Sequence, residues 1–456
     1  MTTTDEIIMN QQVYFQSGQT RKLAFRLRSL KVLLQQLKRY ENELIGALET
    51  DLDKAPYETF MTELSVVYRE LSYCIQNLKY WNSSEIKRTR RFGGRANTEV
   101  RREPYGVALI LSSWSNPLLN TLIPLIDALS AGNCVVIKPS IRTPITTDLL
   151  ANLLAEIFPA KYVKVVVGSK NSAVKLIQDR PNFVFFNGHA SNGRRVMREA
   201  NRWLIPVSAH LDSKCPCVVS QTADIPLAAK RIIWAKLLNV GQSAYAPDYV
   251  IAHESIKTEL IEQMITLLRS TYGFDPTHNP EFQRVVSREH FDRLRGLMNS
   301  GRIMWGGRAN EETLRIEPTI IDRVSWKSPA MKQHIYGPVL PVLTYNDFTA
   351  TLYSLNNLPH PTSLYLFSND QHEIDLVKRF GIYGTCCIND LVVQTMYPDL
   401  PVGGVGYSGF GSYHGKAGHD LFSRLITIYE SDGKKEKNYR YPPFPLNWSG
   451  LKRFFK

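Results

Sequence analysis

Residues 106–140 read GVALILSSWSNPLLNTLIPLIDALSAGNCVVIKPS. Two apolar runs, 107–111 and 134–137, enclose a segment with helical spacing that ends at Gly132. A continuous apolar run of this length is typical of a strand that is covered on both faces, as in a parallel sheet. Strand-like runs and helical patterns continue to alternate as far as residue 204. The alternation predicts a parallel, Rossmann-like sheet.

The flanking segments extend this organisation. Upstream, apolar side chains recur at helical spacing between residues 21 and 81, which predicts two or three amphipathic helices. The polar, glycine-containing stretch 88–103 looks like a surface hairpin. Downstream, a second α/β segment runs from about residue 207 to about residue 393. The chain is therefore expected to hold two α/β units and a hairpin.

The composition is that of an intracellular globular protein. The chain has 456 residues, of which 43% are hydrophobic and 21% are charged. Its six cysteines show no disulfide-framework spacing, which indicates reduced thiols and a cytoplasmic location. The N-terminus lacks the features of a signal peptide and no run of 18 apolar residues occurs, so we expect no membrane-spanning segment.

The net charge of +13 lies largely in two stretches, 87–102 and 434–456. We interpret them as a solvated basic surface and expect no nucleic-acid partner, since net charge alone does not indicate one. The last stretch would place its apolar side chains on one helical face: Trp448, Leu451, Phe454 and Phe455. With lysine and arginine beside that face, a weak contact with a membrane surface is the most that it predicts.

Five motifs carry a family resemblance. REPYGVALILSSW, ALSAGNCVVIKPS, NVGQSAYAPDY, IYGPVLPVLTY and LPVGGVGYSGFGSYHGK together resemble class 3 aldehyde dehydrogenases, from about residue 15 to the YRYPPFP near the C-terminus. The resemblance implies an α/β fold with a Rossmann-like cofactor domain, an α/β catalytic domain and a β-hairpin that bridges two subunits of a homodimer. The implied boundaries are 1–83 and 102–209 for the cofactor-type domain, 210–418 for the catalytic-type domain, 84–101 and 419–433 for the bridging strands, and 434–456 for the basic tail.

The positions that perform the chemistry in that family differ here. There, a cysteine thiolate attacks the aldehyde, an asparagine stabilises the oxyanion, hydride passes to NAD(P)+ and a glutamate activates water. The matching positions hold Ala244, Ser115 and His210. Asn116 stands one residue late, and in an extended segment that shift would turn its side chain to the other face. The resemblance therefore implies a vacant nucleophile position and the absence of aldehyde oxidation.

Part of the family's cofactor site is kept. Trp114 and Lys138 match cofactor-side positions of the family. Gly188 and Gly193 remain in the loop FNGHASNG, which would lead into a helix N-terminus and so offer a place for a pyrophosphate.

Three other cofactor positions have changed. His189 replaces a serine of that loop, Ile141 replaces an acidic residue near the adenosine ribose, and His334 replaces the glutamate that holds the nicotinamide ribose. A histidine cannot accept the paired hydroxyl hydrogen bonds that a carboxylate accepts. NAD or NADP binding is therefore possible, but at a degraded site.

Three hypotheses for function stay open. The first is a repurposed, non-oxidative enzyme in which His210 and Asp212, at i and i+2 of an extended segment, perform acid–base chemistry on a carbonyl or apolar small molecule. The second is an inactive pseudoenzyme that serves as a dimer partner. The third is an NAD(P)-dependent aldehyde oxidoreductase. The ionisable character of the replacements favours the first.

A metal site is a weaker alternative. His189, His210, Asp212 and His334 all offer ordinary metal ligands. Their spacing matches no recognisable motif, and they come from distant segments of the chain. We therefore predict no metal.

Overall fold

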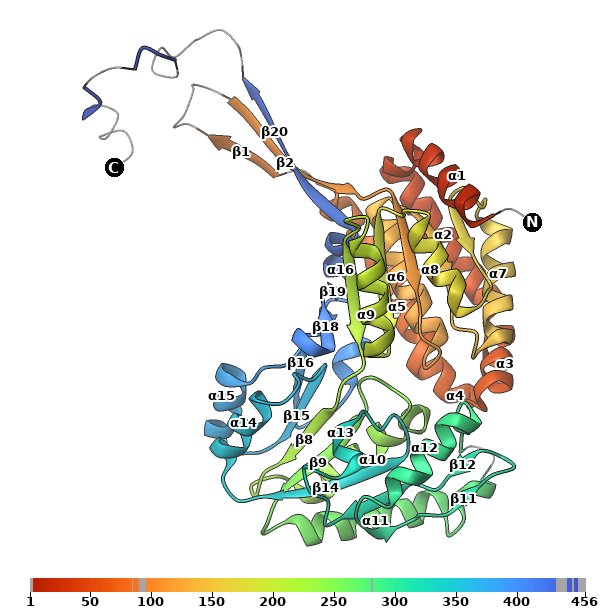
Figure 1. The fold of residues 1–456 in the computed structure, drawn as a ribbon, viewed down its shortest axis with the longest axis vertical. Helices are drawn as coiled ribbons and strands as arrows, with labels where there is room; N and C mark the ends of the chain where they lie inside the picture. The colour runs from red at the N-terminus through yellow and green to blue at the C-terminus, as the bar shows by residue number, and fades with distance from the viewer. Residues whose placement is uncertain are drawn as a thin grey trace.

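The computed structural model describes residues 3–83, 85–89, 96–279, 282–431, 441–444 and 447–449. Two α/β units lie against each other, and a three-stranded sheet projects from the first of them (Figure 1). The α/β architecture predicted from the sequence is confirmed.

A six-stranded sheet in the order β18-β7-β6-β3-β4-β5 forms the first unit. Its strands are β3 (Val107–Leu111), β4 (Cys134–Lys138), β5 (Val163–Val165), β6 (Phe183–Gly188), β7 (Val207–Leu211) and β18 (Gly409–Phe410). All neighbours are parallel except β18, which is antiparallel to β7. Every residue of β3 and β4 is buried, because helices pack against both faces. The helices between these strands are α6 (Pro117–Ala131), α7 (Pro144–Ile157), α8 (Lys170–Gln178) and α9 (Ala190–Asn201).

Five helices precede this sheet and pack beside it. They are α1 (Thr4–Gln16), α2 (Leu23–Arg39), α3 (Glu41–Leu52), α4 (Pro56–Thr59) and α5 (Ser65–Trp81). The leucines that recur at helical spacing, Leu30, Leu33 and Leu37, are fully buried. Between α4 and α5 the chain forms a π-helical turn, Phe60–Leu64, a rare element that often accompanies a functional site.

A seven-stranded sheet in the order β10-β13-β14-β9-β8-β15-β16 forms the second unit. Its strands are β8 (Cys215–Val219), β9 (Pro247–His253), β10 (Arg302–Trp305), β13 (Thr319–Asp322), β14 (Val339–Tyr345), β15 (Ser363–Phe367) and β16 (Thr385–Ile388). Only β10 pairs antiparallel with its neighbour. The main helices of this unit are α10 (Ile225–Leu237), α11 (Lys257–Tyr272), α12 (Arg288–Met298), α13 (Pro329–Lys332), α14 (Phe348–Asn356) and α15 (Gln371–Phe380).

The projecting sheet joins segments that are far apart in the chain. It consists of β1 (Glu85–Thr89), β2 (Ala96–Pro104) and β20 (Ser423–Ser431), paired antiparallel with β2 in the centre. Helix α16 (Gly415–Leu421) leads into β20 from the first unit. The role of this sheet in bridging two subunits stays a prediction, as do the domain boundaries.

The remaining strands are short. They are β11 (Ala309–Asn310) paired with β12 (Arg315–Ile316), and β17 (Val402–Gly403) paired with β19 (Ser412–Tyr413). Across the described ranges, no helix combines the length and the apolar character that crossing a membrane requires. Leu451, Phe454 and Phe455 of the predicted tail lie outside the described residues, so its contact with a membrane surface stays a prediction.

Candidate active site

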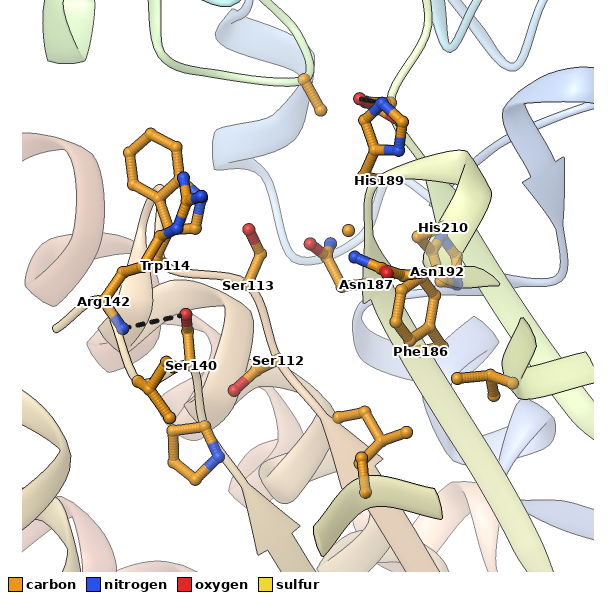
Figure 2. A pocket seen from close by; sticks show the side chains of 18 of the residues that line it. Ser112, Ser113, Trp114, Ser140, Arg142, Phe186, Asn187, His189, Asn192 and His210 are labelled. Carbon is orange, nitrogen blue, oxygen red and sulfur yellow. Dashed lines mark hydrogen bonds and ion pairs between the residues drawn. The ribbon is translucent and has the colours of Figure 1, made fainter. Parts of the chain in front are cut away.

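A cleft of about 460 Å³ lies where the two α/β units meet, at the carboxyl ends of β3, β4 and β6. This edge is where parallel α/β sheets ordinarily bind ligands. Figure 2 shows side chains from its wall, including Trp114, Ser140 and His189. Of the residues singled out from the sequence, nine line the cleft: Trp114, Lys138, Ile141, Gly188, His189, His210, Asp212, Ala244 and His334. Ser115 and Gly193 do not belong to its lining.

The N-terminus of α9 opens onto the cleft and is already occupied by polar groups of the chain. His189 is the N-cap, and its Nδ1 accepts the backbone N–H of Ser191 at 3.2 Å. The carboxylate of Asp212 accepts the N–H of Ala190 at 2.7 Å. Gly193 packs close to Leu211, since a Cβ on it would lie 2.4 Å from a methyl group of that side chain. The positive end of this helix therefore faces an anion supplied by the chain itself.

Asp212 and Asp248 flank the imidazole of His334. Its Nδ1 lies 3.8 Å from Asp212 Oδ2, and its Nε2 lies 3.5 Å from Asp248 Oδ1. The His334 side chain is 7% exposed, and neither ring nitrogen has a hydrogen-bond partner among the described residues.

The two carboxylates stay ionised although they are buried. Burial raises the pKa of Asp212, but the nearby charges of His334 and His189 and the hydrogen bond from the Ala190 N–H together hold it below its usual value. Burial likewise raises the pKa of Asp248, and the charges of Lys214, His334 and Lys236 outweigh it. Lys214 donates hydrogen bonds to Asp248 and to the carbonyl of Ala330.

His210 has a different environment from the one that its spacing suggested. Its Nε2 lies 3.0 Å from Ser208 Oγ, and its ring stacks on Phe185 at 4.8 Å and meets Tyr413 edge-on at 4.6 Å. Burial, and then the charge of His414, lower the pKa of His210 to about 3. The imidazole is therefore neutral at cellular pH. The expectation that His210 exchanges protons there while oriented by Asp212 is wrong, because Asp212 bonds instead to Ala190.

The loop that carries Ala244 has an unusual backbone. Asn239, Val240 and Gly241 have φ values of 50°, 53° and 71°, the left-handed region that non-glycine residues rarely adopt. Asn239 stabilises this conformation by donating hydrogen bonds from its Nδ2 to the carbonyls of Ser115 and Gln242. Functional sites often contain a loop with a strained backbone that surrounding hydrogen bonds stabilise.

A buried thiol lies behind this loop. Cys215 Sγ donates a hydrogen bond to the carbonyl of Ala244 at 3.3 Å. The residue is fully buried and does not line the cleft, and burial raises the pKa of its thiol to about 12. Cys215 is therefore an inert core residue rather than a replacement nucleophile.

A second, smaller cavity of about 40 Å³ lies on the other side of the loop. Ser243, Tyr245 and Ala246 line this cavity, whereas Ala244 lines the large cleft. Most of its remaining wall is apolar: Val66, Leu119, Ala235, Leu238, Val392 and Met396. The loop is thus a wall between two chambers.

Asn116, whose side chain was expected to turn to the other face, lies near the Ala244 loop. It lines the small cavity, whereas Ser115 is 3% exposed and its Oγ accepts a hydrogen bond from Asn120. Asn116 is the N-cap of α6 and Pro117 its first residue, so the segment is a helix entrance and not the extended strand that was assumed. The Asn-Pro pair was the available signal, because both residues favour helix starts.

Several cationic and aromatic residues of the cleft were not predicted. Arg293 donates to the carbonyl of His334 at 3.1 Å, and His290 bonds the carbonyl of Tyr336 at 2.6 Å. Burial and the charge of Arg293 lower the pKa of His290 to about 3. Arg142 lies 3.3 Å from Glu289. No sequence motif marks these residues, since they converge only in the folded chain.

The four residues considered for a metal site are not gathered into one. Asp212 lies 3.8 Å from both His189 and His334, but His210 bonds to Ser208. Within the described ranges, the group whose ligand atoms lie within 4.8 Å of one another is Glu70, Cys74 and Asp127. These three residues are buried and do not line the cleft.

Known proteins resemble this chain along nearly its whole length. The family model described as "Aldehyde dehydrogenase family" matches residues 2–428. The chain is 34% identical to the 4,4'-diaponeurosporen-aldehyde dehydrogenase of Staphylococcus aureus, over 100% of both chains. It is 32% identical to the dimeric NADP-preferring aldehyde dehydrogenase of Canis lupus familiaris, over 97% of this chain and 98% of that one. A solved structure of Staphylococcus aureus AldH in a substrate-bound state superposes with a TM-score of 0.96 at 34% identity, over 100% of both chains.

These relatives correct the function expected from the sequence. Proteins that are 32% to 35% identical along nearly the full chain are named aldehyde dehydrogenases. They point to aldehyde oxidation and away from both the non-oxidative chemistry of His210 with Asp212 and the inactive pseudoenzyme. The third hypothesis, an aldehyde oxidoreductase, is the one that they support.

Proposed function

The chain belongs to the aldehyde dehydrogenase family, and from this we propose that it oxidises an aldehyde to a carboxylic acid with NAD+ or NADP+ as the acceptor. The observation that carries the proposal is the cleft in which Ala244 of the second unit faces the carboxyl ends of the Rossmann-like strands. The loop that carries Ala244 and the edge of the sheet proposed to bind the dinucleotide therefore line the same cleft.

We also propose that three side chains used by the family are replaced, by Ala244, Ser115 and His210. Alanine cannot form a covalent adduct with an aldehyde, so water must supply the oxygen of the product. Addition of water to the carbonyl gives the aldehyde hydrate, whose carbon carries two hydroxyl groups and one hydrogen. Loss of that hydrogen as hydride, and of one hydroxyl proton, leaves the carboxylic acid. The methyl group of Ala244 leaves room in the cleft for this hydrate.

The cleft has the donors that an anionic dinucleotide needs. Four cationic side chains line it, Lys138, Arg142, Arg195 and Arg293, against two carboxylates, Asp212 and Glu289. Side chains of α8 and α9 add an apolar wall suited to a flat base: Ala173, Val174, Ile177 and Val196. When bound, the dinucleotide supplies the hydride acceptor that oxidation of an aldehyde hydrate requires.

Within this site, we propose that Lys138 binds the adenosine side of the cofactor. Its side chain is nearly buried, and Nζ donates to the carbonyl of Pro139 at 2.7 Å, which leaves two further N–H donors. Burial lowers the pKa of Lys138. The Ile141 side chain beside it is 52% exposed and carries no charge that would repel a 2′-phosphate.

We propose an apolar aldehyde as the substrate class. The small cavity is lined mostly by apolar side chains, among them Leu119, Leu238 and Met396. A relative that is 34% identical over both full chains is named 4,4'-diaponeurosporen-aldehyde dehydrogenase. Such a substrate would place its carbonyl group beside Ala244 in the large cleft.

We propose that the protein is a homodimer through its projecting sheet. Strand β20 is an edge strand, and Leu425, Ile428 and Tyr429 on it are 67%, 37% and 49% exposed. An exposed apolar edge strand invites pairing with another chain. Analytical ultracentrifugation of wild type and Leu425→Lys tests this proposal, and a wild-type monomer would refute it.

The oxidation is tested with purified protein, octanal and either NAD+ or NADP+. We expect equal amounts of octanoic acid and reduced dinucleotide, no initial burst, and no loss of activity after treatment with iodoacetamide. A matched control omits the aldehyde. Failure to form acid from octanal, benzaldehyde and a polyene aldehyde with both dinucleotides would refute the proposed function. Inhibition by iodoacetamide would instead refute the water route.

A further inference from the structure

A buried cluster of acidic and thiol side chains lies where helices α5, α6 and α16 pack side by side (Figure 1). Glu70 of α5 and Asp127 of α6 are both 0% exposed, and so is Cys74, one turn after Glu70 on the same face of α5. Gly418 of α16 makes room for the cluster, because a Cβ there would lie 2.0 Å from Asp127 Oδ2. None of these residues lines either cavity described above.

One oxygen of this cluster has no partner. Glu70 accepts the backbone N–H of Gly415 and, at 3.6 Å, the thiol of Cys74. Asp127 accepts the backbone N–H of His414 at the long distance of 3.4 Å, and its Oδ1 is buried without a partner among the described residues. Burial and the Glu70 carboxylate raise the pKa of Asp127 well above its ordinary value. Buried carboxylates in such a position need a proton or a cation to neutralise them.

The separations within the cluster are those of ligands around one metal ion. Ligand atoms of Glu70, Cys74 and Asp127 all lie within 4.8 Å of one another. Cys74 Sγ lies 3.6 Å from Glu70 Oε1, and His414 Nδ1 lies 3.2 Å from Glu70 Oε2. Tetrahedral bonds of about 2.0 Å to oxygen or nitrogen and about 2.3 Å to sulfur place neighbouring ligands about 3.3–3.5 Å apart. A small contraction of the cluster therefore encloses one ion.

We propose that Glu70, Cys74 and Asp127 bind one Zn²⁺ ion, with His414 Nδ1 as the fourth ligand. A thiolate, an imidazole and two carboxylates suit zinc, a cation of intermediate softness that takes four ligands in closed structural sites. Binding releases the thiol proton of Cys74 and the carboxyl proton of Asp127 to the solvent. The inference does not depend on the proposed aldehyde oxidation.

The ion holds three elements together at the base of the projecting sheet. Glu70 and Cys74 come from α5, Asp127 comes from α6, and His414 directly precedes α16, which leads into β20. Because all four side chains are at most 2% exposed, the ion must enter as the chain folds. Zinc at this position therefore stabilises the folded chain against unfolding.

The test measures the metal content of full-length protein produced in medium supplemented with Zn²⁺ or Co²⁺, after a chelating resin has removed loosely bound metal. The wild type should retain about one ion per chain, and with Co²⁺ it should show the charge-transfer absorption of a thiolate ligand. In Cys74→Ser and Asp127→Asn the metal content should fall at least about tenfold, and Cys74→Ser should lose the charge-transfer band. Cys217→Ser is the matched control, a fully buried thiol of β8 that should leave both signals unchanged.

Urea unfolding distinguishes a bound ion from a proton shared between the carboxylates. In protein produced without zinc, Asp127→Asn should be at least as stable as the wild type, because it removes one of two buried acidic groups. In zinc-loaded protein the order should reverse, with the wild type unfolding at the higher urea concentration.

Two results would overturn the zinc site. A wild type that carries no metal from either medium would mean that a shared proton neutralises Glu70 and Asp127. Metal retained equally by the wild type, Cys74→Ser and Asp127→Asn would place the ion elsewhere in the chain.

Discussion

The carboxylate of Asp212 accepts a hydrogen bond from the backbone N–H of Ala190, 2.7 Å away, at the first turn of α9. The carboxylate therefore occupies the N-terminus of α9. In dinucleotide sites, a helix N-terminus in this position ordinarily binds the phosphate groups. For the dinucleotide proposed above, this carboxylate would compete with the pyrophosphate for the N-terminus of the helix. His189 and His334, each 3.8 Å from the same carboxylate, help to keep it ionised.

Replacing Asp212 by asparagine should strengthen dinucleotide binding. Asparagine can still accept the N–H of Ala190 but carries no charge to repel a pyrophosphate. We expect the dissociation constant for NADP+ to fall by about threefold to tenfold, most clearly at low salt. Calorimetric titration measures it. The matched control is Glu289→Gln, which removes a charge at the cleft from a side chain that is 87% exposed and should change little. Weaker binding by Asp212→Asn would contradict the competitor role.

Introducing a thiol at position 244 should open a covalent route. Ala244→Cys places the sulfur in the large cleft, where a thiolate is a better nucleophile than water. We expect turnover of octanal to rise at least about tenfold and to become sensitive to iodoacetamide. Ala246→Cys is the control, since this residue on the same loop lines the small cavity instead. Equal iodoacetamide sensitivity in wild type and Ala244→Cys would contradict the vacancy at this position.

The glycine at position 241 should be irreplaceable. Its φ is 71°, and a Cβ there would lie 2.4 Å from the carbonyl oxygen of Gly337 and 2.9 Å from that of Lys236. Both neighbours are backbone atoms that cannot move aside. Gly241→Ala should cost about 2 kcal/mol or more in the free energy of unfolding and abolish aldehyde oxidation. Urea unfolding and an activity assay check this prediction.

A second glycine gives the matched control. Gly46 lies within α3, and a Cβ there would meet nothing within 4 Å. Gly46→Ala should stabilise the protein by about 0.5–1 kcal/mol, because alanine loses less backbone entropy in a helix. Similar stabilities for the two variants would contradict the steric explanation at position 241.

Acid should destabilise the protein through its buried histidines. The pKa of His210 is about 3 in the folded chain, against an ordinary value near 6.5, so between these values the unfolded chain binds more protons. Stability from this residue is fully present above about pH 6.5 and is lost as the pH falls toward 3. The loss should approach about 1.4 kcal/mol per pH unit. His210→Gln should show a shallower decline in urea unfolding between pH 6.5 and 4.

The control for that measurement is His189→Gln, whose side chain is 65% exposed. It removes an imidazole without altering the contacts of His210 with Phe185 and Tyr413. An unchanged slope in His210→Gln would mean that His210 is protonated in the folded protein, contrary to its buried contacts with Phe185 and Tyr413.

The sequence predicted the sheets better than the site. The apolar runs at 107–111 and 134–137 are strands β3 and β4, because a strand buried on both faces can tolerate only apolar residues. The same cleft is also lined by three residues that the family motifs had indicated, Trp114, Lys138 and Ala244. These features depend on local patterns or on contiguous motifs.

The side-chain directions were harder to predict. Strand β7 ends at Leu211, so the i and i+2 relation of His210 and Asp212 does not continue along a strand. His210 is enclosed by Tyr413, which lies 203 positions away in the chain. A helix begins after Asn116, where the sequence indicated an extended segment, and the side chain of Asn116 lines the small cavity. Such errors arise wherever tertiary contacts, rather than local spacing, decide the orientation.

Side chains of the loop alternate in direction: Ser243 and Tyr245 face the small cavity, and Ala244 faces the large cleft. This alternation affects how such a protein can evolve. Under the proposed function, mutations of Ser243 or Tyr245 would reshape the small cavity, and mutations of Ala244 would change the site where the aldehyde reacts. Selection can therefore act on substrate range and on reactivity as nearly independent traits. Directed evolution can exploit this by diversifying positions 243 and 245 in one library and position 244 in another.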